Sequence, residues 1–208
     1  MTDKSRVTEF TNTLVSDAAD YGIEITPENL DRLAAYYMLL ESWNPRLHLV
    51  APCSPREFAR RHVLESLLLL PHLARDARVA DIGSGAGLPI IPCLIARSDI
   101  KATLFESSKK KAVFLREALD QIGVSATVVA QRFEETASPE VEFVSCRALE
   151  RFEQMLPALI EWAPPESKLL LFGGIGLRER LQESHVNFEE IRIPNSDSRI
   201  LFVVRQSQ

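Results

Sequence analysis

The stretch that decides the fold is rich in glycine and follows a short apolar run: Asp81-Ile82-Gly83-Ser84-Gly85-Ala86-Gly87-Leu88-Pro89. Glycines at alternate positions after a strand let the backbone turn sharply and approach a ligand closely. The apolar run at 79–82 predicts a strand, and residues 89–96 predict a helix. We therefore expect this loop to be a strand-to-helix turn of a parallel α/β sheet.

The spacing of the glycines indicates the kind of ligand. A dinucleotide fingerprint, GxGxxG, would need a glycine at position 88, which is Leu88. The observed (D/E)xGxGxG spacing is typical of proteins that bind S-adenosylmethionine, and the Asp81 carboxylate suits the positive charges of that cofactor. Taken alone, such a loop is also compatible with a structural turn or a nucleotide site. The loop residues expected to bind the cofactor are Asp81, Gly83, Ser84, Gly85, Gly87 and Leu88.

Two further features support a cofactor site. Glu106 ends the next predicted strand, 101–105, where an acid can accept hydrogen bonds from two ribose hydroxyls. Phe133 and Glu134 follow the strand predicted at 126–130, and Phe133 offers an apolar wall for an adenine ring. All these residues fall at the carboxyl ends of strands, where doubly wound folds bind ligands. The alternative for Glu106 is a solvated acid that faces the lysine run 109–111.

Residues 1–75 predict a helical N-terminal cap. One helix spans 7–21 and stops at Gly22. A second begins at Thr26-Pro27-Glu28, with a hydroxyl cap followed by proline at the first helical position. A third begins at Ser54-Pro55-Arg56-Glu57, which has the form of a capping box.

Residues 76–208 predict an α/β domain, because strands alternate with helical stretches of ten to fifteen residues. The last stretch, 187–205, predicts an antiparallel hairpin around Pro194-Asn195-Ser196-Asp197. We therefore expect one compact unit: a class I, Rossmann-like methyltransferase fold with a doubly wound, mostly parallel sheet, a C-terminal antiparallel hairpin and a helical cap. The other strands are predicted at 79–82, 101–105, 126–130, 141–145, 168–172 and 200–204, with helices at 89–96 and 108–122 and in the later gaps.

Length and composition limit the class of protein. The 208 residues suffice for one substantial domain with a small appendage. No apolar run reaches the roughly twenty residues that cross a bilayer, and the first residues lack the apolar core of a signal peptide. We expect a cytoplasmic monomer with no membrane partner.

The cysteines and the net charge exclude further classes. Cys53, Cys93 and Cys146 are scattered and form no CxxC pair, which argues against disulfides and against a zinc site. We interpret them as small buried hydrophobes and expect no metal. A net charge of −5 gives no overall attraction to nucleic acid, so an RNA ligand would need a local basic patch.

Ordered motifs along the chain resemble one family, the bacterial 16S ribosomal RNA guanine-N7 methyltransferases, also called glucose-inhibited division protein B. The resemblance runs from residue 30 to residue 208. The combination of WN, RHxLxS and SxRA is more specific than the glycine loop, which many methyltransferases share. The segments that carry it are LLESWN (39–44), LHLV (47–50), RHVLESL (61–67), the loop at 81–89, ESSKKK (106–111), FL (114–115), RFEE (132–135) and SCRA (145–148).

The resemblance implies methyl transfer from S-adenosylmethionine to N7 of a guanine in 16S ribosomal RNA, within the small ribosomal subunit. It implies cofactor contacts for Gly83, Leu88, Phe133 and Glu134. This nitrogen presents a lone pair and loses no proton on attack, so catalysis can come from positioning and electrostatics without a general base.

The resemblance also places Arg147 between cofactor and RNA, as the one catalytic candidate. Arg147 follows the strand predicted at 141–145, where a guanidinium can bind phosphate or hold the edge of a base. The alternative is a structural ion pair with Glu106 or Glu150.

Basic residues gather in two places that are candidates for RNA contact. Arg56, Arg60 and Arg61, with His62, lie in the third predicted helix, and Lys109 to Lys111 and Arg116 begin the helix after Glu106. The alternatives are solvated helix faces and, for His62, a structural histidine.

The chain departs from the family pattern at three places. It has His48-Leu49-Val50 where the family usually has Asn-Leu-Thr, and Glu106 where aspartate is commoner. It has Gly173-Gly174 where the family usually has Lys-Gly, which puts RNA contact, rate or target nucleotide in question. Two other functions therefore stay open: methylation of a small molecule or protein, and cofactor binding without catalysis.

Overall fold

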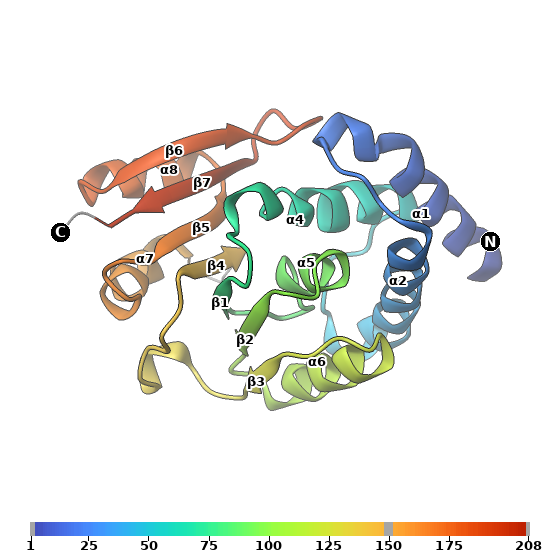
Figure 1. Cartoon of the computed structure of the whole chain (residues 1–208), viewed down its shortest axis with the longest axis horizontal. Coiled ribbons are helices and arrows are strands. Elements are labelled where there is room, and N and C mark those ends of the chain that lie inside the picture. Colours follow the sequence, from blue (N-terminus) through green and yellow to red (C-terminus); the bar gives the residue numbers. More distant parts are fainter. Residues whose placement is uncertain (1–2, 148–151, 207–208) are drawn as a thin grey trace.

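A seven-stranded sheet in the order β3-β2-β1-β4-β5-β7-β6 forms the centre of the computed structural model, which describes residues 3–147 and 152–206 (Figure 1). Strands β1 to β5 are parallel, whereas β7 runs antiparallel to both β5 and β6. This confirms the doubly wound sheet and its C-terminal hairpin. The strands are β1 (Arg78–Ile82), β2 (Lys101–Phe105), β3 (Thr127–Val129), β4 (Phe143–Arg147), β5 (Lys168–Gly173), β6 (Asn187–Arg192) and β7 (Ile200–Arg205).

Helices cover both faces of the sheet (Figure 1). One face carries α5 (Ile90–Ala96) and α6 (Lys109–Gln121), and the other carries α7 (Phe152–Trp162) and α8 (Ile175–Glu183). The chain leaves β1 toward β2 and β3 on one side and later returns to β4 on the other side of β1. The crevice for a ligand is therefore expected at the carboxyl ends of β1 and β4, where the strand order reverses.

The N-terminal helices pack outside α5 and α6. One cluster of buried apolar side chains runs without a break from these helices through α5 and α6 to the sheet, so the cap and the sheet share a core. The change from helices to strands falls between His72 and Arg78. The N-terminal elements are α1 (Asp3–Asp17), η1 (Ala18–Tyr21), α2 (Pro27–Leu47), α3 (Pro55–Phe58), the π-helical η2 (Ala59–Leu64), α4 (Glu65–Leu67) and η3 (Leu70–His72).

Local signals predicted the ends of these helices. Gly22 ends η1 with a φ of 68°, and the Thr26 hydroxyl caps α2 by accepting a hydrogen bond from the amide of Asn29. The Ser54 hydroxyl likewise accepts a hydrogen bond from the amide of Glu57, at 3.1 Å. The Glu57 carboxylate, however, binds Arg61 instead of completing the predicted capping box.

Two of the differences from the sequence prediction bear on the site. Strand β4 begins at Phe143 rather than at 141 and extends to Arg147, so Arg147 is the last residue of the strand. The third helix contains the π-helical segment η2, and the carbonyl of Arg61 in this segment accepts a hydrogen bond from Arg147 Nη2. Such segments are frequent at functional sites. In the described part of the chain, no helix has the length and apolar character of a membrane span.

Candidate functional site

The glycine loop between β1 and α5 depends on its glycines. Gly83, Gly85 and Gly87 have φ values of 68°, 52° and 86°, in the left-handed region that favours glycine. A Cβ at Gly87 would lie 2.3 Å from Ile91 Cδ1. The amide of Gly83 donates a hydrogen bond to the carbonyl of Phe105 at 2.9 Å, which fixes the loop against the end of β2.

Asp81, in β1, lies fully buried beneath this loop. Its Oδ1 accepts a hydrogen bond from Ser145 Oγ at 2.6 Å, whereas its Oδ2 is buried without a hydrogen-bond partner among the described residues. Burial is the main reason that the pKa of Asp81 rises to about 6. An unpartnered buried carboxylate oxygen is costly, so this atom suits a cationic ligand that supplies a donor or a charge.

Glu106 is also buried, so the interpretation as a solvated acid facing the lysine run is wrong. Its Oε2 accepts a hydrogen bond from the amide of Gly85 at 2.8 Å, and its Oε1 accepts one from the amide of Ser108 at 2.7 Å. The carboxylate thus joins the glycine loop to the start of α6. Each oxygen retains the capacity to accept a second hydrogen bond, as ribose hydroxyls would require.

A cavity of about 450 Å³ opens at the carboxyl ends of β1 and β2. Phe133 is buried and packs edge-to-face on Trp162 at 5.5 Å, while Glu134 is exposed beside it in the short helix η4 (Phe133–Glu135). The volume is in the range of small-molecule sites. Three of the predicted cofactor residues, Gly83, Phe133 and Glu134, line this cavity. The full set of lining residues is Ile82, Gly83, Phe105, Ser107, Gln131, Arg132, Phe133, Glu134, Gln154 and Met155.

Arg147 ends β4 and points toward the cap. Its Nη2 donates hydrogen bonds to Glu65 Oε2, at 2.9 Å, and to the carbonyl of Arg61, while its guanidinium lies 5.2 Å from the centre of the Phe172 ring. Its Nη1 is buried without a partner among the described residues. The partner of Arg147 is thus Glu65 rather than one of the acids predicted from the sequence. Glu150, the other candidate partner, and Ala148 of the SxRA motif lie outside the described residues.

Residues 29–194 match the model of one protein family, GidB, described as rRNA small subunit methyltransferase G. The chain belongs to this family. The predicted resemblance is confirmed, and with it the class of enzyme, an rRNA methyltransferase.

Two similar relatives carry the name Ribosomal RNA small subunit methyltransferase G. The protein from Nitrosospira multiformis is 41% identical over 122 residues, which cover 58% of this chain and 56% of the relative. The protein from Sorangium cellulosum is 34% identical over 174 residues, which cover 80% of this chain and 73% of the relative. The first alignment therefore spans little more than half of its relative.

Solved structures support the fold. A SAM dependent methyltransferase from Aquifex aeolicus has a TM-score of 0.59 at 12% identity, and the match covers 81% of this chain and 97% of that one. At this identity the likeness shows the fold alone. It confirms the predicted methyltransferase architecture.

The candidates for RNA contact in this GidB-family chain lie in different environments. Arg60 pairs with Asp17, and Arg61 pairs with Glu57 at 2.6 Å. Lys109 is exposed at the first position of α6. His62 is half-buried, and burial, followed by the nearby Arg147, lowers its pKa to about 3. The histidine is therefore neutral and offers RNA no positive charge.

The cap supports the site through two residues that the sequence did not mark as functional. Tyr36 of α2 donates a hydrogen bond from its hydroxyl to the carbonyl of Ala86, at 2.6 Å, inside the glycine loop. Glu65 lies within the RHxLxS motif, but only the fold reveals that it binds Arg147. Tyr36 belongs to the apolar face of its helix, so no local signal marks its contact with the loop.

The departure from the family at position 173 has a packing explanation. A Cβ on Gly173 would lie 2.5 Å from Leu177 Cδ2 and 2.8 Å from its Cβ, so a lysine there needs α8 to shift. At position 50, where the family usually has threonine, both hydrogen bonds between Asn44 and Val50 use the backbone of Val50, at 3.0 and 3.1 Å. A valine in place of threonine leaves these bonds intact.

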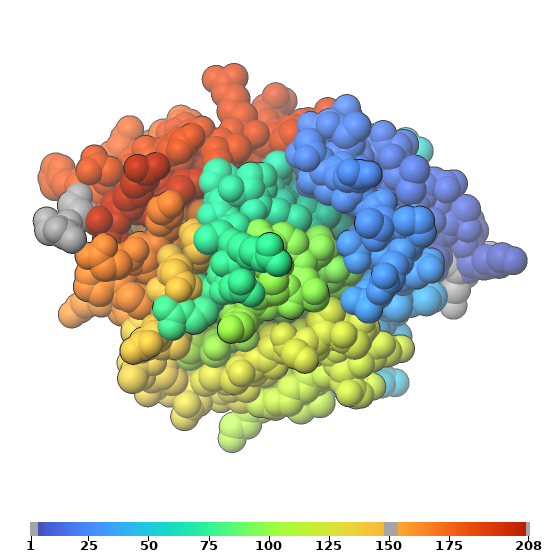
Figure 2. Space-filling model, in the orientation of Figure 1, coloured from blue at the N-terminus to red at the C-terminus, as the bar shows by residue number. Residues whose placement is uncertain are grey.

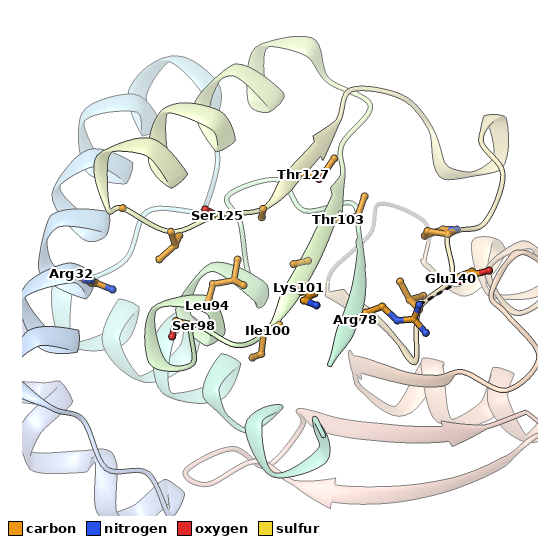
Figure 3. Close-up of a pocket in the computed structure, with 16 residues that line it drawn as sticks. Arg32, Arg78, Leu94, Ser98, Ile100, Lys101, Thr103, Ser125, Thr127 and Glu140 are labelled. Carbon is orange, nitrogen blue, oxygen red and sulfur yellow. Dashed lines mark hydrogen bonds and ion pairs between the residues drawn. The ribbon is translucent and has the colours of Figure 1, made fainter. Parts of the chain in front are cut away.

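A second cavity, of about 630 Å³, lies at the opposite edge of the sheet (Figure 3). Arg78, Lys101 and Thr103 line it near the amino ends of β1 and β2, and none of the predicted site residues does. Doubly wound folds bind ligands at the carboxyl ends, so this cavity is not the cofactor site. Among the described residues, no group of three or more His, Cys, Asp or Glu side chains is placed to hold a metal.

Proposed function

We propose that the protein transfers a methyl group from S-adenosylmethionine to N7 of a guanine in 16S ribosomal RNA. It acts as a cytoplasmic monomer on the small ribosomal subunit and uses no metal. The observation that carries the proposal is the unpartnered, buried Oδ2 of Asp81 beneath a loop of left-handed glycines. This arrangement suits a small cationic ligand at the carboxyl ends of β1 and β2.

The residues at this edge fit the cofactor, which supplies a methyl group on a positively charged sulfur. Asp81 faces the positive charges, and Glu106 accepts from the ribose hydroxyls. Phe133 forms the apolar wall for the adenine, with Glu134 at the rim of the cavity. The glycine loop receives the rest of the cofactor through Gly83, Ser84, Gly85, Gly87 and Leu88.

Arg147 orients the guanine. The edge of guanine that carries N7 also carries the acceptor O6. The buried Nη1 of Arg147 has no partner among the described residues, so it can donate to O6 and leave the N7 lone pair free to attack. Because N7 carries no proton, the site needs no general base, and the neutral state of His62 is no obstacle.

Residues 1–75 act as a cap on the catalytic domain, residues 76–208, within one compact unit that shares a core. In this proposal Arg60 and Arg61 of the cap bind the RNA backbone, and the hydrogen bond from Arg147 to the Arg61 carbonyl supports it. His62, whose pKa is lowered by burial, would contribute its ring surface rather than a charge to the RNA contact. Lys109, at the start of α6, extends the contact on the cofactor side.

Methyl transfer from labelled S-adenosylmethionine to 30S subunits and to naked 16S ribosomal RNA tests this function. We expect one modified guanine, located by mapping the labelled base. Gly85→Asp should abolish cofactor binding in calorimetry, because it adds a bulky anion at a left-handed position beside Glu106. Label in a small molecule or protein, or binding without transfer, would favour the two other functions.

A further inference from the structure

A cavity of about 340 Å³ lies between the N-terminal cap and the loop that joins β6 to β7. In Figure 1 this loop reaches the first helices, and Figure 2 shows the hairpin and the N-terminal helices in contact along the upper edge of this face. The Tyr21 hydroxyl donates a hydrogen bond to the carbonyl of Pro194 at 3.3 Å, which links the cap to the loop between β6 and β7. The lining residues are Tyr21, Ser54, Arg56, Glu57, Arg60, Arg61, Asn195 and Arg199.

Positive charge dominates this lining, which contains four arginines and one glutamate. Arg56 is exposed and forms no ion pair with any described residue. The other three are each paired on one side, Arg60 with Asp17, Arg61 with Glu57 and Arg199 with Glu65, and Asp20 lies near Arg60. We call this the arginine cavity. Its lining is positively charged, and acidic partners hold three of its four arginine side chains in position.

The ion pairs leave the arginines able to bind an anion. The side chains of Arg60 and Arg61 are 42% and 44% exposed. The pair of Arg61 with Glu57 is exposed on both sides, so it contributes little to stability, whereas Asp17, the partner of Arg60, is 13% exposed. Arg199 binds Glu65 through Nε and Nη2, which leaves its Nη1 without a hydrogen bond to the described residues. Guanidinium groups bind phosphate oxygens in a forked geometry, so a phosphodiester fits this donor set.

The arginine cavity is joined directly to the proposed base site. Glu65 binds Arg199 through Oε1 and Arg147 through Oε2, and the carbonyl of Arg61 accepts a hydrogen bond from the same Arg147. A group bound in the cavity is therefore separated from Arg147 by single side chains.

We propose that the arginine cavity binds a backbone phosphate of ribosomal RNA next to the target guanine. The inference rests on the proposed function and deepens it, since Arg56 and Arg199 join Arg60 and Arg61 in one site built from both ends of the chain. A chain with a net charge of −5 repels RNA overall, so it needs a local anion site of this kind. Because both walls are fixed before RNA arrives, binding loses little side-chain freedom.

The salt dependence of binding to naked 16S ribosomal RNA and to 30S subunits tests the proposal. Arg56→Ala should lower the slope of log affinity against log salt by about one and weaken binding roughly five- to tenfold at physiological salt. Arg56→Lys, which keeps the charge, should retain the slope. Arg32→Ala is the matched control, because Arg32 lies on α2 in an exposed pair with Glu28 and lines the cavity at the opposite sheet edge.

Each result decides one question. An unchanged slope in Arg56→Ala, with an unchanged melting temperature and cofactor affinity, overturns the arginine cavity as a phosphate site. Weaker binding to 30S subunits alone, with naked RNA unaffected, also overturns it and indicates a ribosomal protein. If Arg56→Ala lowers the slope but the wild-type protein transfers no methyl group, the phosphate site stands and the proposed reaction fails.

Discussion

Glu65 accepts a hydrogen bond from Arg147 at 2.9 Å, although the two residues are 82 positions apart. The Glu65 side chain is 1% exposed and the Arg147 side chain 11% exposed. The other oxygen of this carboxylate accepts hydrogen bonds from Nε and Nη2 of Arg199, at 2.9 and 2.6 Å. One acid of the cap thus joins the end of β4 to the C-terminal hairpin. It holds the proposed base site and the arginine cavity in a fixed relation.

Replacing Glu65 by glutamine should destabilise the protein strongly. Two guanidinium groups would lose their shared counterion in a largely buried place, and breaking such a pair costs about 3–5 kcal/mol. Urea unfolding measures the loss. Glu57→Gln is the control, because its pair with Arg61 is about 40% exposed and should contribute less than about 1 kcal/mol. Equal losses in the two variants would contradict a structural role for Glu65.

The raised pKa of Asp81 predicts a pH-dependent stability. Burial raises this pKa from 3.8 to about 6 in the folded protein, so the folded state favours the protonated carboxyl. Stability is therefore lost as pH rises from about 4 to 6, by up to roughly 3 kcal/mol. Asp81→Asn removes this titration. Between pH 4 and 7, the free energy of unfolding of the variant should therefore rise relative to that of the wild type by up to roughly 3 kcal/mol.

Chemical denaturation of both proteins at several pH values, without ligand, measures the difference. A difference that stays constant over this range would show that Asp81 does not titrate as its burial implies. Adding S-adenosylmethionine at pH 7 should reduce the difference in the free energy of unfolding between the two proteins. The reason is that the cationic cofactor stabilises the ionised carboxylate, which only the wild type has.

Local sequence patterns predicted the features that depend on a few neighbouring residues, namely the helix ends and the glycine loop. The capping hydroxyls of Thr26 and Ser54, the stop at Gly22 and the glycine loop act over a few residues, and the structure has each of them. The strand-to-helix turn at the glycine loop could therefore be predicted from the sequence. Its use of Asp81, Glu106, Phe133 and Glu134 as cofactor ligands stays a prediction.

Contacts between distant segments could not be predicted in this way. Glu65 meets Arg147 and Arg199 only because the cap, β4 and the hairpin pack together, and no periodicity within the cap encodes that meeting. The π-helical segment η2 was missed for a related reason. It keeps a helical spacing of apolar residues, and only its hydrogen bonds distinguish it from an α-helix.

Gly87 should be the least replaceable glycine of the loop. Alanine there adds a Cβ 2.3 Å from Ile91 Cδ1 at a φ of 86°, so overpacking and backbone strain combine. We expect a loss of about 2–4 kcal/mol in the free energy of unfolding. Gly123→Ala is the matched control, since Gly123 also has a positive φ but no atom within 4 Å of its Cβ position. It should lose only about 1 kcal/mol. A larger loss at Gly123 would refute the packing argument.

Arg147→Ala should impair methyl transfer more than it impairs folding. Glu65 keeps Arg199 as its partner in this variant, so its charge stays compensated. The guanine, in contrast, loses the donor proposed to hold O6, and loss of one such preorganised donor lowers kcat by about 10²–10³. Arg147→Lys preserves the charge but not the planar fork that reaches Glu65, the Arg61 carbonyl and a base together, so it should recover stability and little activity. Single-turnover transfer at saturating cofactor, compared with thermal melting, separates the two effects. A wild-type rate in Arg147→Ala would remove this residue from the reaction.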